Sequence, residues 1–376
     1  MSKIGQKHSK GAVARAGKTL ISTPDDLEKV TAAMDILSWW RISHESALEQ
    51  ALSTVKSVCE INPTREIVGK RLKRLPAILE KLRRFEDDNM TLKNMHDIAG
   101  FRVVFNNKKN MIKAVRKIKK SSAFEVNGRK PKMRDYVSSP KKDGYRSVHF
   151  DLQFYNNENE QRYVEAQFRT KIQHSWATMV EMIDICTNQS IKTQRGDENW
   201  KKFFISLGYL FERLDSISNF ENLTDKQKVE KSAELILLDE ESKDHLLMFN
   251  TLSRRLNVAK KLVLYTRSLE IIGKMGDIDG YVMIEIDLDK MTINTKVFNK
   301  TDVQSAEREY AKIELKSIGK NNNVIALVST ENKKSLEDAY PNYFANTRYA
   351  LEQLSLLAAL CKELPWLVKF TKNLQY

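Results

Sequence analysis

The sequence predicts an α+β protein in which a mixed β-sheet is flanked by helices. Apolar residues recur every three or four positions between Thr23 and Glu60, and again from Ile172 onward, as helices require. Apolar and polar residues instead alternate over Ser147–Phe154 and Arg162–Phe168, which is typical of half-buried strands. A second strand-rich stretch begins at Gly280 and predicts a separate, smaller α+β unit.

The helical segments follow from their start signals and apolar spacing. Thr23 and Pro24 suit a helix N-cap and first turn, and the apolar positions that follow run to Trp40. A further helix is expected to start near Pro76, and another to cover about Lys108–Lys120. Helical spacing returns at Ile172 and continues to about Gly273. An acidic connection around 216–225 is expected to be exposed.

The strands are expected on each side of one long loop. Ala99–Phe105 precedes the loop, and the two alternating segments named above follow it. Pro140 and the Asp143–Gly144 pair mark the loop itself. Beyond Gly280, we expect strands at 280–288, 294–298 and 323–329, a helix over Val303–Ile318, and helices to the end.

These changes of pattern predict four parts. They are an N-terminal helical segment (1–60), a catalytic-type α+β domain (61–215), a helical connector (216–279) and a C-terminal α+β regulatory domain (280–376).

The positive charge is concentrated in one stretch. The chain has 376 residues and a formal net charge of +14. Between Ile61 and Phe150 there are 24 Lys and Arg against 9 Asp and Glu, so the remainder is close to neutral. Such a concentration indicates a polyanionic partner, which is nucleic acid, an acidic membrane surface or nucleotide phosphates, or else a solvated charged face.

Several classes of protein are excluded. The three cysteines, Cys59, Cys186 and Cys361, are too far apart for a zinc cluster or a disulfide framework. No apolar run is long enough for a signal sequence or a membrane span. We therefore expect a cytoplasmic protein with no membrane partner. The glycines before Lys18–Thr19 resemble those of a phosphate-binding loop. Their spacing does not match that motif, however, and no strand precedes them.

The candidate chemistry lies in the strands. Glu165, Gln167 and Arg169 alternate with apolar residues and should share one face of a strand. His149 and Asp151 do the same on the preceding strand. Acids among many Lys and Arg residues suit a nucleotide polyphosphate with Mg²⁺, or a nucleic-acid binding module without catalysis.

Several motifs, taken together, resemble the synthetase domain of the RelA/SpoT family of alarmone synthetases. The resemblance covers about residues 60–215 and implies a nucleotidyltransferase-like core. Its motifs are Asp97–Arg102, Arg134–Tyr136, Gly144–His149, Val164–Thr170 with Trp176, and the upstream Arg71, Lys73 and Lys81.

The resemblance implies transfer of the β,γ-pyrophosphate of ATP to a ribose 3′-hydroxyl, with release of AMP. Asp97 and Glu165 would hold Mg²⁺, and Glu165 would also activate the hydroxyl. The ATP-binding residues would be Arg71 and Arg102 around the adenine and Lys73 and Lys81 on the phosphates. The acceptor-binding residues would be Tyr145, stacked on the base, with Arg134, His149 and Gln167; many members have Lys in place of Arg134.

The resemblance leaves the acceptor open. Family members use GDP or GTP, adenosine nucleotides or the 3′-CCA end of tRNA. The residues before Ile61 carry no HD metal motif, so we expect a member without the hydrolase domain. A catalytically silent RNA-binding module on the same fold is the alternative.

The C-terminal part more loosely resembles the antitoxin-like domain of fused toxin–antitoxin members, some of which act in defence against phage. The Tyr340-Pro341-Asn342-Tyr343 element would mask the ATP site. A phage or cellular protein that binds the C-terminal part would then expose the ATP site again. The alternative is that two tyrosines at this spacing simply pack against the rest of the protein from the start of a helix.

Overall fold

The computed structural model describes residues 7–22, 26–62, 64–73, 75–187, 196–237, 239–274, 280–287, 290, 292–302, 305–306, 309, 313, 323–330 and 343–363. The chain divides into two compact units. The first comprises Met1–Ser139 and Ser147–Thr170, and the second comprises Pro140–Arg146 and Lys171–Tyr376. The division at Lys171 falls inside the range 61–215 predicted as one domain, and the four-part organisation stays a prediction.

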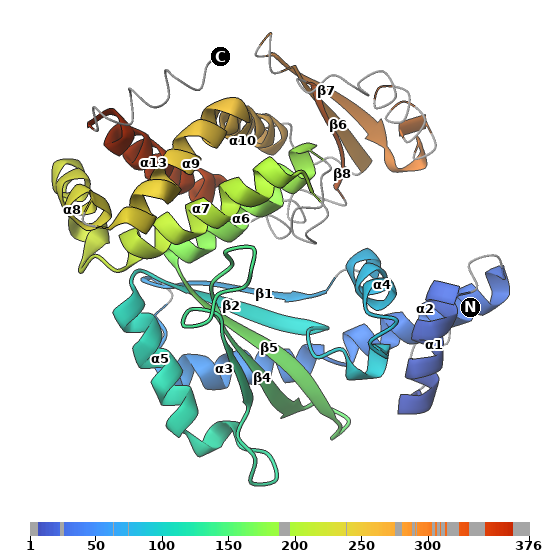
Figure 1. Cartoon of the computed structure of the whole chain (residues 1–376). Coiled ribbons are helices and arrows are strands. Elements are labelled where there is room, and N and C mark those ends of the chain that lie inside the picture. Colours follow the sequence, from blue (N-terminus) through green and yellow to red (C-terminus); the bar gives the residue numbers. More distant parts are fainter. Residues whose placement is uncertain are drawn as a thin grey trace. The chain divides into compact units, whose positions relative to one another are not determined.

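The first unit is built around a five-stranded mixed sheet (Figure 1). Its helices are α1 (Lys10–Ser22), α2 (Leu27–Ile42), α3 (Glu45–Cys59), α4 (Leu75–Arg84) and α5 (Lys108–Lys120), with short turns η1 (Leu92–Asn94) and η2 (Ser122–Phe124). Its strands are β1 (Ile67–Leu72), β2 (Ala99–Phe105), β3 (Lys132–Asp135), β4 (Val148–Tyr155) and β5 (Gln161–Thr170). The strand order is β1-β2-β5-β4-β3, and only the β2–β5 pair is parallel. The predicted α+β class with a mixed sheet is confirmed.

One face of this sheet is apolar and covered by α3 and α5 (Figure 1). Along β5, Val164, Ala166 and Phe168 are fully buried on this face, as the alternation predicts. Met111 and Ile118 of α5 pack onto the same layer. The opposite face therefore carries the polar side chains of the strands.

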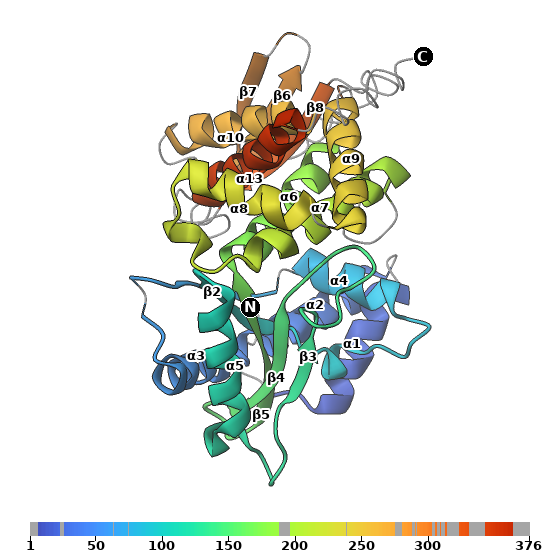
Figure 2. The ribbon, with the colours of Figure 1, turned by 60° about the vertical axis from the view of Figure 1, so that its left-hand side comes forward.

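A second apolar cluster joins α1, α2 and α4, whose neighbouring positions are visible in Figure 2. Gly17 lies inside α1, where a Cβ would stand 3.0 Å from the Cβ of Leu92, so this glycine allows close helix packing. The stretch from Gly11 to Thr19 is helical throughout. Its rejection as a phosphate-binding loop is therefore confirmed.

The sequence prediction was incomplete in this unit. The helix predicted over 23–60 is two helices, because the side chains of Ser43 and His44 both donate to the carbonyl of Trp40 and close α2 there. The helix α1 and the strands β1 and β3 were not predicted. Both strands lie at the sheet edges, where exposed polar residues blur the alternation.

A buried arginine ties the N-terminal helices to the sheet. Arg162 on β5 is 1% exposed, its guanidinium lies 4.3 Å from the ring centroid of Trp40, and its Nε donates to Ser43 Oγ at 2.9 Å. Its Nη2 also donates to Glu160 at 2.6 Å. We expect Arg162→Met to lower the free energy of unfolding by about 3 kcal/mol, because the buried ionic contacts are lost.

Urea denaturation measures this change. The exposed Arg65→Met serves as the control and should change stability by less than about 0.5 kcal/mol. Equal effects of the two variants would contradict the structural role of Arg162.

The second unit is mainly helical (Figure 2). Its helices are α6 (Lys171–Thr187), α7 (Glu198–Asp215), α8 (Asp225–Leu237), α9 (Glu240–Arg255), α10 (Val258–Lys274) and α13 (Tyr343–Glu363), with short turns η4 (Phe220–Asn222) and η5 (Lys300–Asp302). A three-stranded antiparallel sheet has the order β7-β6-β8, from β6 (Gly280–Asp287), β7 (Thr292–Asn299) and β8 (Asn323–Thr330).

The three C-terminal strands were predicted, and the structure confirms them. The helix predicted over Val303–Ile318 falls mostly outside the described residues. The connection at 216–225 is not simply exposed, because Phe220 is buried in the helical core. Trp176 is buried there too. Cys59 and Cys361 are free and buried, and burial raises the pKa of each thiol to about 12.

Across the described part of the chain, every helix is too short or too polar to cross a membrane.

Candidate active site

The strand register gathers the predicted site residues on the polar face of the sheet. Residues directly opposite one another on neighbouring strands point to the same face. One row across the sheet is therefore Arg71, Gly100, Glu165, Asp151 and Lys132, and the next row is Gly69, Arg102, Gln167, His149 and Arg134. The structure thus brings together, on five different strands, residues that lie up to 98 positions apart in the chain.

Asp97 stands just before β2 and is bound by two lysines. Lys73 Nζ donates to its Oδ2 at 2.8 Å, and Lys81 Nζ from α4 donates to its Oδ1 at 2.7 Å. Burial alone would raise the pKa of Asp97, but the two ammonium groups outweigh it and lower the pKa to about 2. Asp97 is therefore ionised at neutral pH.

The backbone of Lys73 is itself held on both sides. Its N–H donates to the carbonyl of Ile98 at 2.7 Å, and its carbonyl accepts from Arg41 Nε at 2.8 Å. Arg41 lies in the last turn of α2, 32 residues upstream. Sequence reasoning missed Arg41, since nothing in the helical pattern indicates that this arginine faces the sheet.

Glu165 lies at the centre of the polar face. Its carboxylate accepts from His149 Nδ1 at 3.0 Å, from Gln167 Nε2 at 2.6 Å and from Arg134 Nη2 at 3.3 Å. Burial would raise the pKa of Glu165, but the hydrogen bonds from His149 and Gln167 lower it to about 2. Burial lowers the pKa of His149. A neutral His149 thus donates its Nδ1 proton to an ionised carboxylate.

These two carboxylates suit a magnesium ion. The described residues contain no cluster of three or more His, Cys, Asp or Glu side chains arranged for a metal. Mg²⁺, however, needs only one or two protein carboxylates when phosphate oxygens supply the other ligands. Asp97 and Glu165 are both ionised, and the charge of Asp97 acts on the pKa of Glu165. The donor set therefore fits Mg²⁺, and the ion itself stays a prediction.

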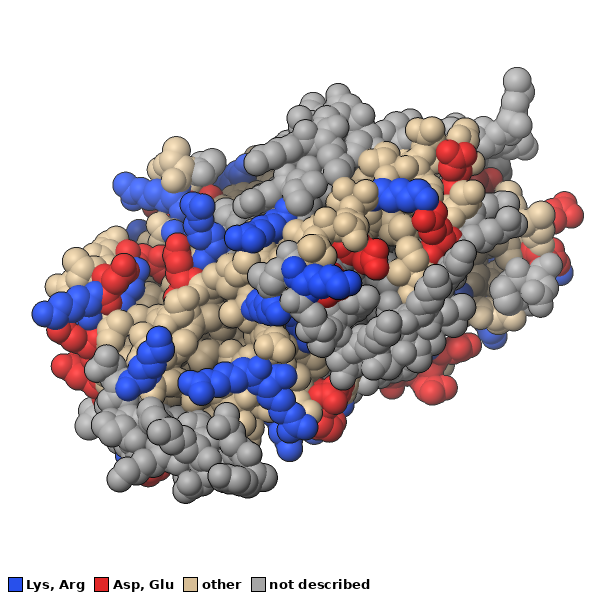
Figure 3. Space-filling model, turned by 90° about the horizontal axis from the view of Figure 1, so that it is seen from above, with Lys and Arg blue, Asp and Glu red and all other residues tan. Residues whose placement is uncertain are grey.

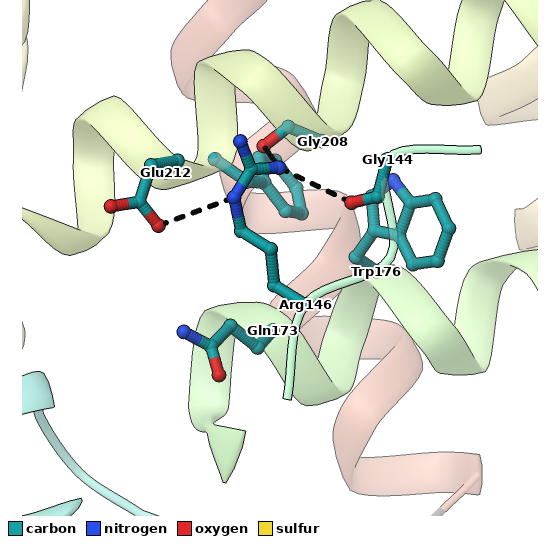
Figure 4. A pocket seen from close by; sticks show the side chains of 7 residues that line it. Gly144, Arg146, Gln173, Trp176, Gly208 and Glu212 are labelled. Carbon is teal, nitrogen blue, oxygen red and sulfur yellow. Dashed lines mark hydrogen bonds and ion pairs between the residues drawn. The ribbon is translucent and has the colours of Figure 1, made fainter. Parts of the chain in front are cut away.

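Tyr145 belongs to the second unit. It lies in the 140–146 loop, where its ring makes an edge contact with Trp176 at 6.2 Å between centroids. Arg146 beside it donates to the carbonyls of Gly144 at 3.2 Å and Gly208 at 3.0 Å, and pairs with Glu212 at 3.5 Å (Figure 4). The loop carrying Tyr145 is thus fixed to α7.

Two glycines allow this attachment. Gly144 has a φ of +91°, which favours glycine. A Cβ on Gly208 would lie 2.8 Å from the carbonyl oxygen of Gly144. We expect Gly208→Ala to push the loop away from α7 and to lower the free energy of unfolding by about 2 kcal/mol.

Chemical denaturation measures the effect of Gly208→Ala. Lys202→Ala, on the same helix but facing outward, is the matched control and should be nearly neutral. A neutral Gly208→Ala variant would contradict the close contact between loop and helix.

The basic excess is not confined to the polar face. Helix α5 carries Lys or Arg at seven of its 13 positions and has no acidic residue. Because α5 covers the apolar side of the sheet, these charges lie in the layer opposite the candidate site. The face of the molecule seen in Figure 3 instead mixes Lys and Arg with Asp and Glu.

The candidate site lies in a part of the chain that is similar to known proteins. Residues 70–183 match the family model described as the region found in RelA / SpoT proteins. The GTP pyrophosphokinase YwaC of Bacillus subtilis (strain 168) is 31% identical over 135 residues, which cover 34% of this chain and 62% of that protein. The GTP pyrophosphokinase YjbM of the same organism is 28% identical over 159 residues, covering 39% of this chain and 72% of that protein.

Solved structures of alarmone synthetases are also similar to part of this chain. Small alarmone synthetase 1 from Bacillus subtilis, bound to its product pppGpp, is 24% identical and covers 47% of this chain and 93% of its own, with a TM-score of 0.39. Small alarmone synthetase 2 from the same organism is 20% identical, covers 46% of this chain and 91% of its own, and has a TM-score of 0.38.

This chain therefore contains the region found in RelA / SpoT proteins and is similar, over that part, to GTP pyrophosphokinases. The match to YwaC spans less than two thirds of that protein's length, and the family region covers less than half of this chain.

Proposed function

We propose that this protein is an ATP-dependent pyrophosphokinase that transfers the β,γ-pyrophosphate of ATP to the 3′-hydroxyl of GDP or GTP and releases AMP. The polar face of the sheet carries this proposal, because two ionised carboxylates, Asp97 and Glu165, stand there among lysines and arginines. The curated relatives, both GTP pyrophosphokinases, support guanosine nucleotides as acceptors.

The donor side of the site is formed by β1, β2 and α4. Arg71 and Arg102 are diagonal neighbours on one face of the sheet, which puts them about 7–8 Å apart. Two planes that enclose an aromatic ring are separated by roughly 7 Å, so the guanidinium groups could stack on both faces of adenine. Lys73 and Lys81 are paired with Asp97 in this structure. When ATP binds, they would contact its phosphates instead.

The transfer step would use Glu165 as the base. The acceptor 3′-oxygen forms a bond to the β-phosphorus, the bond from that phosphorus to the α,β-bridging oxygen breaks, and AMP leaves with that oxygen. The proton of the 3′-hydroxyl passes to Glu165. Mg²⁺, when bound by Asp97 and Glu165, would neutralise charge on the phosphates. Arg134, His149 and Gln167 on the polar face would bind the acceptor, and the role of Tyr145 stays a prediction from the sequence.

A transfer assay tests this function. The purified protein is incubated with γ-labelled ATP and, separately, GDP, GTP, ATP or deacylated tRNA. We expect label in a guanosine nucleotide and an equal amount of AMP. A protein that binds RNA but releases no AMP with any acceptor would be the catalytically silent module instead.

We also propose tRNA as a second acceptor to be tested, for which the basic surface of α5 is the supporting observation. Lys and Arg side chains that neutralise RNA phosphates release counterions, so binding through them weakens steeply with salt. Label found only in guanosine nucleotides, never at a tRNA 3′ end, would rule this acceptor out.

Control by the C-terminal part is a separate proposal. An alarmone synthetase whose product accumulates would inhibit growth unless it were restrained. We propose that the region from 280 onward restrains it as an antitoxin-like domain, relieved by a phage or cellular protein. Tyr340 lies outside the described residues, and Tyr343 is the first residue of α13. If Tyr340→Ala with Tyr343→Ala leaves AMP release and growth inhibition unchanged, this restraint is wrong.

A further inference from the structure

Asp151 is a buried carboxylate on the polar face to which the sequence assigned no role. Its side chain is 2% exposed, and both of its oxygens are occupied. Arg134 Nη2 donates to Oδ1 at 2.5 Å and Nη1 donates to Oδ2 at 2.8 Å, which makes a two-pronged ion pair. Only the planar guanidinium fork of arginine can make this contact.

His96 completes the shell around Asp151. Its Nδ1 lies 3.0 Å from Oδ2 of Asp151, and its ring stacks on Tyr163 at 3.7 Å between centroids. Burial would raise the pKa of Asp151, but the hydrogen bonds from His96 and Arg134 outweigh it and lower the pKa. Asp151 is therefore an anchor whose two oxygens are held by Arg134 and His96.

The carboxylate of Asp151 fixes the position of the Arg134 guanidinium. Asp151 and Glu165 are directly opposite each other on β4 and β5, so both carboxylates compete for the same cation. Asp151 takes both prongs of Arg134, and Glu165 keeps a single contact of 3.3 Å with Nη2. Arg134 thus bridges the two carboxylates while leaving Glu165 mainly bound to His149 and Gln167.

We propose that Asp151 is a positioning residue for the acceptor half of the site. By holding the Arg134 fork, it aims the remaining N–H groups of Arg134 at the phosphates of a nucleotide acceptor and prevents this arginine from closing onto Glu165. This role rests on the proposed function, since it assumes that Arg134 faces the acceptor. The donor half, formed around Lys73 and Lys81, does not depend on it.

Asp151→Asn is the test variant, because the amide keeps the size of the side chain but can no longer accept both prongs of the fork. We expect the KM for GDP to rise about tenfold, in line with the cost of misplacing a binding group. The affinity for the ATP analogue AMPCPP, measured by calorimetry, should stay within about twofold. Arg134→Lys keeps the charge without the fork and should behave like Asp151→Asn.

The two substitutions together give the decisive comparison. If Asp151 acts through Arg134, the double variant should be no worse than either single variant. Glu158→Gln removes an exposed carboxylate from the turn of the same hairpin and should leave both constants unchanged. Additive effects, or an equal loss of AMPCPP affinity, would overturn the positioning role.

A direct measurement separates this role from the proposed function. ¹⁵N NMR of the arginine side chains should find rotation of the Arg134 guanidinium restricted in the unmodified protein and free in Asp151→Asn. Free rotation in the unmodified protein would overturn the anchor whatever the activity. Failure of the unmodified protein to release AMP with any acceptor would instead overturn the proposed function.

Discussion

Asp97→Asn is expected to lower the rate of AMP release from ATP about a thousandfold. The amide has the shape of the carboxylate but no charge, so it cannot serve as an anionic metal ligand. It would also leave Lys73 and Lys81 without their common partner. Because both lysines then remain free for phosphates, AMPCPP should bind at least as tightly as before.

The matched control for this variant is Asp35→Asn, which neutralises an exposed carboxylate on α2. It should leave the rate unchanged. Both variants should unfold at temperatures close to that of the unmodified protein. An Asp97→Asn protein that still releases AMP within a few-fold of the normal rate would show that Asp97 is only an ion-pair partner of the two lysines.

Glu165→Gln is expected to have a comparably large effect, a fall in kcat of about 10³, within the range for loss of a general base. The amide cannot take the proton of the 3′-hydroxyl. It keeps the volume of the side chain among His149, Gln167 and Arg134, so the KM for ATP should change little.

Single-turnover kinetics at saturating ATP and GDP measure the chemical step directly. Glu158→Gln again serves as the control for loss of a carboxylate. A kcat that is unchanged, combined with a raised KM for GDP, would assign Glu165 to binding and would remove it from the transfer step.

Local pattern was enough to predict the strands and helices that contain the site. The strand predicted over Ala99–Phe105 and the helix predicted over Lys108–Lys120 match β2 and α5 residue for residue. Edge strands were harder to predict from the sequence. In β1, for example, Lys70 and Arg71 are exposed polar residues that interrupt the apolar pattern of a strand. Arg71 belongs to the polar face, whereas Lys70, opposite Phe101, belongs to the other face and pairs with Glu49.

The contacts that build the site depend on register and on packing between distant segments, which no local pattern contains. The pairing of β4 with β5 brings Asp151 opposite Glu165, and the pairing of β3 with β4 brings Arg134 within reach of both. Arg41 of α2 donates to the carbonyl of Lys73, 32 residues further along the chain, and only the fold brings the two together. Residue types in the sequence could therefore suggest which side chains form the site. Which of these side chains contact one another could be seen only in the folded structure.

The positions of the label in the products test the central claim most directly. The protein is incubated with GDP and, in parallel, with α-labelled or γ-labelled ATP. Pyrophosphate transfer predicts that all α-label appears in AMP and that an equal amount of γ-label appears in the guanosine nucleotide, both abolished by Asp97→Asn. α-Label in ADP, or γ-label in free phosphate or free pyrophosphate, would contradict it.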